Sequence, residues 1–237
     1  MEGWLDEEIG CSHRGAPIRV FLPARPRALL VAGVHGEEPE TVWLARRLLE
    51  RITAEDAEIA IIACANPDGV ADSIRQNAAG VDLNRNYPSA SWVPEDSFTY
   101  PPGTAWDERQ RENRTSRSTP GAAPGSEPET QAVLALVERL EPELVIDLHA
   151  PLELVLPTAD APMATVEELA ARARLPVTME LGSRTPGALR DWCADRGLPA
   201  ITYEVEHAGL PALGARHLPA LEWLVRGRRS SPRRRLP

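Results

Sequence analysis

The chain has 237 residues, a hydrophobic fraction of 43% and a formal net charge of −9. This length suits one α/β domain, and the hydrophobic content is sufficient for a sizeable core. The negative charge argues against nucleic acid as a partner. Arginines with serines and prolines among them make the C-terminus basic, so we expect a folded domain over 1–226 and a disordered tail over 227–237.

The N-terminus and the cysteines indicate in which cellular compartment the protein acts. Residues 1–8 are acidic and contain no apolar segment, which excludes a signal peptide there, and no apolar run is long enough to span a bilayer. Cys11, Cys64 and Cys193 are scattered and form no Cys-x-x-Cys pair, as is typical of reduced thiols. We therefore expect a cytoplasmic protein with no membrane partner.

Apolar runs and helical periodicities alternate along the chain. We expect strands at 18–22, 28–34, 57–65, 144–148, 152–156 and 200–205. We expect helices at 38–52, 126–140, 162–173, 187–196 and 211–226. Ser126 and Glu129 have the spacing of a capping box at the start of the second helix. The alternation predicts a single α/β domain with a mixed, mostly parallel sheet and helices on both faces.

Two histidines and a glutamate follow predicted strands. His35-x-x-Glu38 comes directly after the apolar run 28–34, and His149 ends the run that begins at 144. Imidazole and carboxylate both bind zinc, and three protein ligands leave a fourth position open, as in catalytic zinc sites. The alternative is structural: His35 caps a turn, and Glu38 is a solvated residue in the first turn of the next helix.

The segment 66–125 is rich in Asn, Pro, Gly, Ser and Arg, has little periodicity, and is too long to be an idle connection. We expect it to line a site. Its densest polar cluster, 75–88, holds Arg75, Asn84 and Arg85, and arginine binds carboxylates through paired hydrogen bonds. The alternative is a turn-rich loop in which Arg85 makes a structural ion pair.

The late strand at 200–205 carries polar side chains on one face, since residues two apart point the same way. Among them, Glu204 could take a proton from water beside a metal. The alternative is an edge strand with a solvated face. The other histidines, His13, His207 and His217, have no ligand spacing with His35, and we expect them at the surface.

The order of these motifs resembles that of the zinc carboxypeptidases. The motifs are Gly-Val-His-Gly-Glu-Glu (33–38), Asn-Pro-Asp-Gly (66–69), Gly-Val-Asp-Leu-Asn-Arg-Asn-Tyr-Pro (80–88), Pro-Gly-Ser-Glu-Pro-Glu-Thr (124–130), the isolated His149, Thr-Pro-Gly (185–187) and Trp-Cys-Ala-Asp (192–195). The resemblance covers roughly residues 8–225. It is strongest to short bacterial members that cleave the γ-D-glutamyl-meso-diaminopimelate bond of cell-wall (murein) peptides.

The resemblance implies a role for each matching residue. His35, Glu38 and His149 would hold one zinc ion per chain. Glu204 would be the general base, and Arg75 would stabilise the oxyanion. Asn84 and Arg85 would bind the terminal carboxylate of a small peptide substrate, which makes the expected activity that of a metallocarboxypeptidase.

Three positions depart from the family pattern, and they bear on specificity. Ala150 stands where the amidases carry Asp, Ser183 where the family carries Tyr, and Ala188 where the amidases carry Ser. Arg184 and Arg190 could favour an acidic substrate or point to solvent. The alternatives are a carboxypeptidase of different C-terminal specificity, an N-acyl amino acid amidohydrolase of the aspartoacylase or desuccinylase type, and a non-catalytic module with the same fold.

Overall fold

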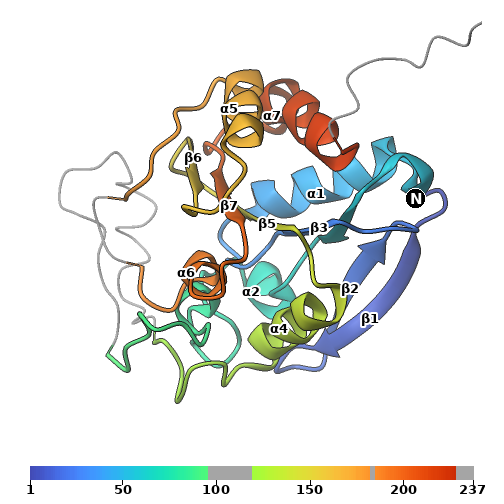
Figure 1. The fold of residues 1–237 in the computed structure, drawn as a ribbon. Coiled ribbons are helices and arrows are strands. Elements are labelled where there is room, and N and C mark those ends of the chain that lie inside the picture. Colours follow the sequence, from blue (N-terminus) through green and yellow to red (C-terminus); the bar gives the residue numbers. More distant parts are fainter. Residues whose placement is uncertain (96–118, 182–184, 228–237) are drawn as a thin grey trace, which may run out of the picture.

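A seven-stranded sheet forms the centre of the molecule, in the order β1-β2-β4-β3-β5-β7-β6 (Figure 1). The computed structural model describes residues 1–95, 119–181 and 185–227. The strands are β1 (Leu5–Cys11), β2 (Pro17–Leu22), β3 (Ala28–Val31), β4 (Ile59–Ile62), β5 (Leu144–His149), β6 (Leu154–Pro157) and β7 (Ala200–Glu204). The central strands β4, β3, β5 and β7 run parallel, whereas β1, β2 and β6 pair antiparallel at the two sides.

Helices cover both faces of this sheet (Figure 1). They are α1 (Pro39–Arg51), α2 (Pro67–Asp72), α4 (Pro128–Leu140), α5 (Met163–Ala173), α6 (Leu189–Ala194) and α7 (Leu210–Val225), with short 3₁₀ turns η1 (Ala54–Asp56) and η2 (Leu83–Arg85). One buried cluster joins the sheet to α1, α5 and α7, and a second joins it to α4 and α6. The expected single α/β domain with a mixed sheet is confirmed. The tail at 228–237 lies outside the described residues.

The parallel strands owe their position to their composition. All four residues of both β3 and β4 are buried, and so are all six of β5. A strand that is buried throughout must be covered on both faces, and the centre of a sheet with a layer of helices on each side provides this. The carboxyl ends of β3, β5 and β7 therefore meet at one edge of the sheet.

Two local features differ from the sequence-based expectation. Strand β1 was not predicted, because most of its residues are exposed or half-buried and its acidic sequence shows no apolar alternation. The prediction of a capping box at the start of α4 was also wrong. The N-cap is Glu127, no side chain caps the helix, and Ser126 Oγ instead donates to Glu127 Oε1 at 2.6 Å.

No helix within 1–95, 119–181 or 185–227 is both long enough and apolar enough to cross a membrane.

Candidate metal centre and active site

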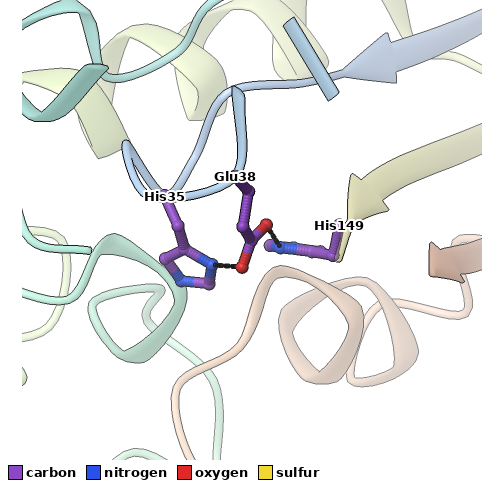
Figure 2. Close-up of side chains that lie close together, drawn as sticks. All are labelled: His35, Glu38 and His149. Carbon is purple, nitrogen blue, oxygen red and sulfur yellow. Dashed lines mark hydrogen bonds and ion pairs between the residues drawn. The ribbon is translucent and has the colours of Figure 1, made fainter. Parts of the chain in front are cut away.

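His35, Glu38 and His149 meet at the carboxyl edge of the sheet (Figure 2). His35 and Glu38 lie in the loop between β3 and α1, and His149 is the last residue of the adjacent parallel strand β5. All three side chains are buried, and their potential ligand atoms lie within 4.8 Å of one another. Because Glu38 is buried, the alternative in which it is a solvated residue in the first turn of the next helix is wrong.

The Glu38 carboxylate lies between the two imidazoles. His35 Nδ1 is 2.7 Å from Glu38 Oε1, and His149 Nδ1 is 3.1 Å from Glu38 Oε2. Burial by itself would raise the pKa of Glu38, but the nearby imidazoles outweigh it and the net pKa is lowered. The carboxylate is therefore ionised, and two nitrogens and one carboxylate converge from two strand ends.

A second carboxylate stands behind each imidazole. Asp82 Oδ1 lies 3.1 Å from His35 Nε2, and Asp147 Oδ2 lies 2.9 Å from His149 Nε2. The Asp147 contact has the length of an ion pair but not the geometry of a hydrogen bond. Carboxylates in this position orient metal-binding histidines, because they fix which ring nitrogen carries the proton. Each Nε2 is thereby occupied, and each Nδ1 faces the shared centre.

These residues fit a zinc ion. Two imidazole nitrogens and one carboxylate, buried and mutually within 4.8 Å, form a donor set that zinc prefers. Asp82 and Asp147 were not singled out from the sequence. A signal for Asp147 was present, since residues two apart on a strand share a face and Asp147 precedes His149 by two.

The Asn-Pro-Asp-Gly motif holds the loop that carries His35. Asn66 Nδ2 donates to the carbonyl oxygens of Val34 and Gln76, both at 3.1 Å, and its Oδ1 accepts from Gly69 N. Gly36 packs so closely on Gly69 that a Cβ at Gly36 would lie 1.9 Å from the Gly69 carbonyl carbon. Any side chain at Gly36 would therefore displace the loop between His35 and Glu38.

Arg75 lies beside the centre and is largely buried. Its Nε donates to Asp82 Oδ2 at 2.8 Å, and its Nη1 lies 3.4 Å from Glu37 Oε1 and 3.7 Å from Glu38 Oε1. Burial opposes ionisation of Asp82, but Arg75 and His35 hold the pKa of Asp82 well below its usual range. Asp82 thus links the guanidinium to the imidazole.

Asn84 and Arg85 form the next part of the same edge. Asn84 Nδ2 lies 3.2 Å from His149 Nε2, and Arg85 Nη1 donates to the Asn84 carbonyl oxygen at 2.7 Å. Gly187 packs against this pair, because a Cβ there would lie 2.2 Å from the Arg85 carbonyl oxygen, and its φ is +74°. Only glycine accommodates both the contact and the positive φ.

Glu204 ends β7 and pairs in register with His149. Its Oε2 accepts a hydrogen bond from Leu152 N at 3.2 Å. Burial raises the pKa of Glu204 to about 7. Because β7 lies between β5 and β6, the edge-strand alternative is wrong. The structure therefore brings every sequence-predicted site residue to one edge of the sheet.

The surface expectation for His217 is also wrong. His217 is fully buried. Its Nδ1 is hydrogen-bonded to Tyr203 Oη at 2.8 Å, and its Nε2 lies 2.6 Å from Glu206 Oε2. Glu206 also pairs with Arg216 at 3.2 Å, so it is engaged in this network. His207 is exposed, as expected, and its Nδ1 lies 3.0 Å from Glu40 Oε1.

His13 is exposed, as expected, but it lies close to two buried carboxylates. Its Nε2 is 2.7 Å from Glu127 Oε2, and its backbone N–H donates to Glu129 Oε1. These three residues form a second group with the spacing of metal ligands. Asn77 Nδ2 already donates to both carboxylates, at 2.8 and 3.1 Å.

The three positions that depart from the family pattern are also located. Ala150 is buried, and its backbone N–H donates to Glu38 Oε2 at 3.2 Å. An aspartate there would bury another carboxylate beside Glu38. Ala188 is buried as the N-cap of α6. Ser183 lies outside the described residues, as does Arg184.

Comparison with known proteins assigns the family. The zinc carboxypeptidase family model matches residues 7–211. Murein peptide amidase A of Escherichia coli (strain K12) is 36% identical over 224 residues, covering 93% of this chain and 89% of the relative. The Vibrio campbellii protein of the same name is 31% identical over 214 residues, covering 89% of this chain and 83% of its own length.

Solved structures of zinc carboxypeptidase-like proteins share this fold. The murein-tripeptide amidase MpaA from Escherichia coli O157 superposes with a TM-score of 0.83 at 34% identity, covering 95% of this chain and 92% of that one. Thrombin activatable fibrinolysis inhibitor superposes with a TM-score of 0.75 at 17% identity, covering 94% and 69%, which shows a shared fold. The chain belongs to the zinc carboxypeptidase family, whose members are peptide hydrolases, as its motifs predicted.

Proposed function

We propose that this chain is a zinc-dependent metallocarboxypeptidase that hydrolyses the C-terminal amide bond between γ-D-glutamate and meso-diaminopimelate in murein peptides. The observation that carries the proposal is the buried group of His35, Glu38 and His149 with Glu204 in register beside it. The substrate class is supported by relatives named murein peptide amidase A over nearly the whole chain.

One zinc ion per chain would be held by His35, Glu38 and His149, whose donor atoms suit it. A bound zinc ion supplies Lewis-acid chemistry, which polarises a carbonyl group and makes a water molecule more acidic. Asp82 would orient His35 through Nε2, and Asp147 would orient His149 in the same way.

Glu204 would act as general base and then as general acid. It accepts a proton from the attacking water and delivers it to the nitrogen of the leaving amine. Two features support this role. The side chain is buried in register with His149, and its pKa of about 7 suits a group that both gains and loses a proton near neutral pH.

The polar side chains around the centre would position the substrate. Arg75 would stabilise the negative charge on the carbonyl oxygen as that carbon becomes tetrahedral. Asn84 and Arg85 would bind the terminal carboxylate, which an internal peptide bond does not offer, and so restrict cleavage to the C-terminus. These roles are supported by where the side chains lie, because Asn84 contacts His149 and Arg75 contacts Asp82.

The same centre is chemically compatible with two other classes of substrate. One is a peptide with a different C-terminal residue, and the other is an N-acyl amino acid, as in the aspartoacylase or desuccinylase type. The Asn84-Arg85 pair, packed against Gly187, favours a substrate with a terminal carboxylate on the leaving residue. We further propose that the protein acts in the cytoplasm on small murein peptides.

Mass spectrometry of products tests the proposal. Zinc-loaded protein is incubated with L-Ala-γ-D-Glu-meso-diaminopimelate, with ordinary dipeptides and with an N-acyl amino acid. We expect free diaminopimelate and L-Ala-D-Glu from the tripeptide. Release of an acyl group alone, or cleavage of the dipeptides alone, would assign one of the other substrates.

A further inference from the structure

Helix α7 contacts the face of β7 that lies opposite the Glu204 side chain. Tyr203 and Glu204 are consecutive strand residues, so their side chains point to opposite faces of the sheet. Tyr203 is fully buried in the cluster that joins the sheet to α5 and α7, which lie side by side (Figure 1). Its hydroxyl is hydrogen-bonded to His217 Nδ1 at 2.8 Å, and the two rings meet at 84°. The strand at Glu204 is therefore fixed from the far face of the sheet.

The same imidazole holds the chain just beyond the strand. His217 Nε2 lies 2.6 Å from Glu206 Oε2. Burial lowers the pKa of His217, so the ring is neutral near pH 7 and carries one N–H. Because the Glu206 carboxylate only accepts, Nε2 donates to it and Nδ1 accepts from the Tyr203 hydroxyl. His217 thus binds the residues on both sides of the stretch that contains Glu204.

Arg216, the preceding residue on α7, contacts three further segments. Its Nη1 donates to Glu153 Oε2 at 3.0 Å and lies 3.2 Å from Glu206 Oε2. Its Nε and Nη2 donate to the carbonyl oxygens of Ala173 and Arg174, where α5 ends, at 2.9 and 3.0 Å. A single surface ion pair contributes little to stability, whereas a network of charges with good geometry contributes more. The guanidinium therefore joins α5, the end of β7 and the loop before β6.

Glu153 is important because the residue before it contacts Glu204. The backbone N–H of Leu152 donates to Glu204 Oε2 at 3.2 Å. Glu153 has a φ of +55°, in the left-handed region that side chains other than glycine rarely adopt. Such a backbone persists only where the surrounding structure holds it, and the contact with Arg216 provides such a hold. Arg216 thereby fixes the loop that brings the Leu152 N–H to the carboxyl group.

We propose that Arg216 and His217 position the Glu204 carboxyl for its reaction. His217 fixes β7 on both sides of Glu204, and Arg216 fixes the loop that carries its hydrogen-bond donor. Both act through Glu204, so they are positioning residues and not catalytic ones. This inference rests on the proposed function, because it assigns the two residues to the step in which Glu204 takes a proton from water.

Loss of Arg216 should change kcat and not KM. A displacement of about 1 Å can cost up to 10²-fold in rate, and a misplaced base affects the transition state more than the bound substrate. We expect Arg216→Gln to lower kcat by about 10-fold while KM stays within about twofold and the zinc content is unchanged. Arg216→Lys keeps a cation for Glu153 but cannot reproduce the bonds to α5, so it should restore part of the kcat.

The matched control is Arg172→Gln. The Arg172 side chain is 35% exposed, compared with 28% for Arg216, and it lies on the neighbouring helix α5. It pairs with Glu168 at 2.7 Å and stacks on Trp223, so its loss should leave kcat at the wild-type value. Glu206→Gln keeps an acceptor oxygen for both residues of α7, and it should therefore preserve the positioning.

Combination with Glu204→Gln separates positioning from a general loss of structure. In the wild-type background, Arg216→Gln displaces a working base. In the Glu204→Gln background no base remains, so the further loss of kcat should fall below about twofold. An equal loss in both backgrounds would show that Arg216 acts on the whole site, and the inference would be overturned.

Hydrogen exchange gives a readout that needs no turnover. The amides of Leu152 and Glu153 should exchange faster in Arg216→Gln than in the wild type, whereas those of α4 should be unchanged. Tyr203→Phe removes only a hydroxyl group, and it should speed exchange at the end of β7 and lower kcat in the same way. Glu153→Gln changes an exposed residue, so it provides the same tests with smaller effects if Arg216→Gln does not fold.

The outcomes distinguish this inference from the proposed function. If these variants retain the wild-type kcat, or if exchange at Leu152 and Glu153 is unchanged, the inference is overturned while the proposed function stands. If no γ-D-glutamyl peptide is cleaved, the proposed function fails. Exchange alone then decides: faster exchange supports the hold that α7 has on the two segments, and unchanged exchange overturns it.

Discussion

His149 and Glu204 lie opposite each other at the ends of the neighbouring parallel strands β5 and β7. The backbone N–H of Val205 donates to the His149 carbonyl oxygen at 2.8 Å, which fixes the register at this point. A shift of one residue would turn Glu204 to the other face of the sheet. The sheet register therefore keeps the proposed base beside the proposed metal ligand.

Metal content should depend on His149. Wild-type protein is expected to contain one zinc ion per chain, and His149→Ala should contain essentially none, because two of three ligands hold zinc too weakly. His13→Ala is the control, since His13 belongs to the second group of metal-ligand spacing. Elemental analysis after dialysis measures both. Zinc retained in His149→Ala but lost in His13→Ala would move the site to Glu127 and Glu129.

Glu204→Gln should lower kcat by at least about 10²-fold without loss of zinc, because the amide keeps the shape but accepts no proton. Glu206→Gln is the matched control and should retain most of the kcat. Its carboxylate already contacts His217 and Arg216. Steady-state kinetics with elemental analysis measures the pair. A larger loss in Glu206→Gln than in Glu204→Gln would transfer the role of base to Glu206.

Glu204→Gln should also stabilise the zinc-free protein against unfolding at alkaline pH. Burial raises the pKa of Glu204 from its ordinary value of 4.5 to about 7, against the opposing effect of His149. Between these values the folded state binds more protons than the unfolded state, so stability falls as pH rises from about 4.5 to 7 and is then level. Glu204→Gln removes this loss.

We expect the free energy of unfolding of Glu204→Gln, measured in chelator by urea denaturation, to exceed that of the wild type by at most about 3 kcal/mol at pH 8. The difference should shrink as the pH falls toward 4.5 and vanish well below it, where Glu204 is protonated in both states. An equal difference at both pH values would show that the ionisation of Glu204 is not its cause.

Arg85 and Arg75 should affect different kinetic constants. Arg85→Ala should mainly raise KM, because the terminal carboxylate is bound in the ground state and the transition state alike. Arg75→Ala should mainly lower kcat, by about 10²–10³-fold, because the oxyanion forms only later. Steady-state kinetics on one tripeptide substrate separates the two effects, and the reverse pattern would exchange the two roles.

The sequence by itself determined the fold class, most of the helices and strands and the family. Buried parallel strands such as β3 and β5 are continuous apolar runs, and the motif around His35 is local, so both are visible without coordinates. Strand β1 escaped detection because its exposed, acidic residues carry no apolar period. The Ser126 capping box failed because Ser126 Oγ donates to Glu127 rather than accepting from the helix backbone.

Only the tertiary structure decided which distant side chains meet. Asp82 lies 47 residues from His35 in sequence and contacts its Nε2. His217 is buried against Tyr203, although its sequence neighbourhood gives no sign of it. Arg190 lines a cavity rather than facing solvent. These facts depend on strand register and on the packing of loops at one edge of the sheet, and the local periodicity of the chain does not encode either one.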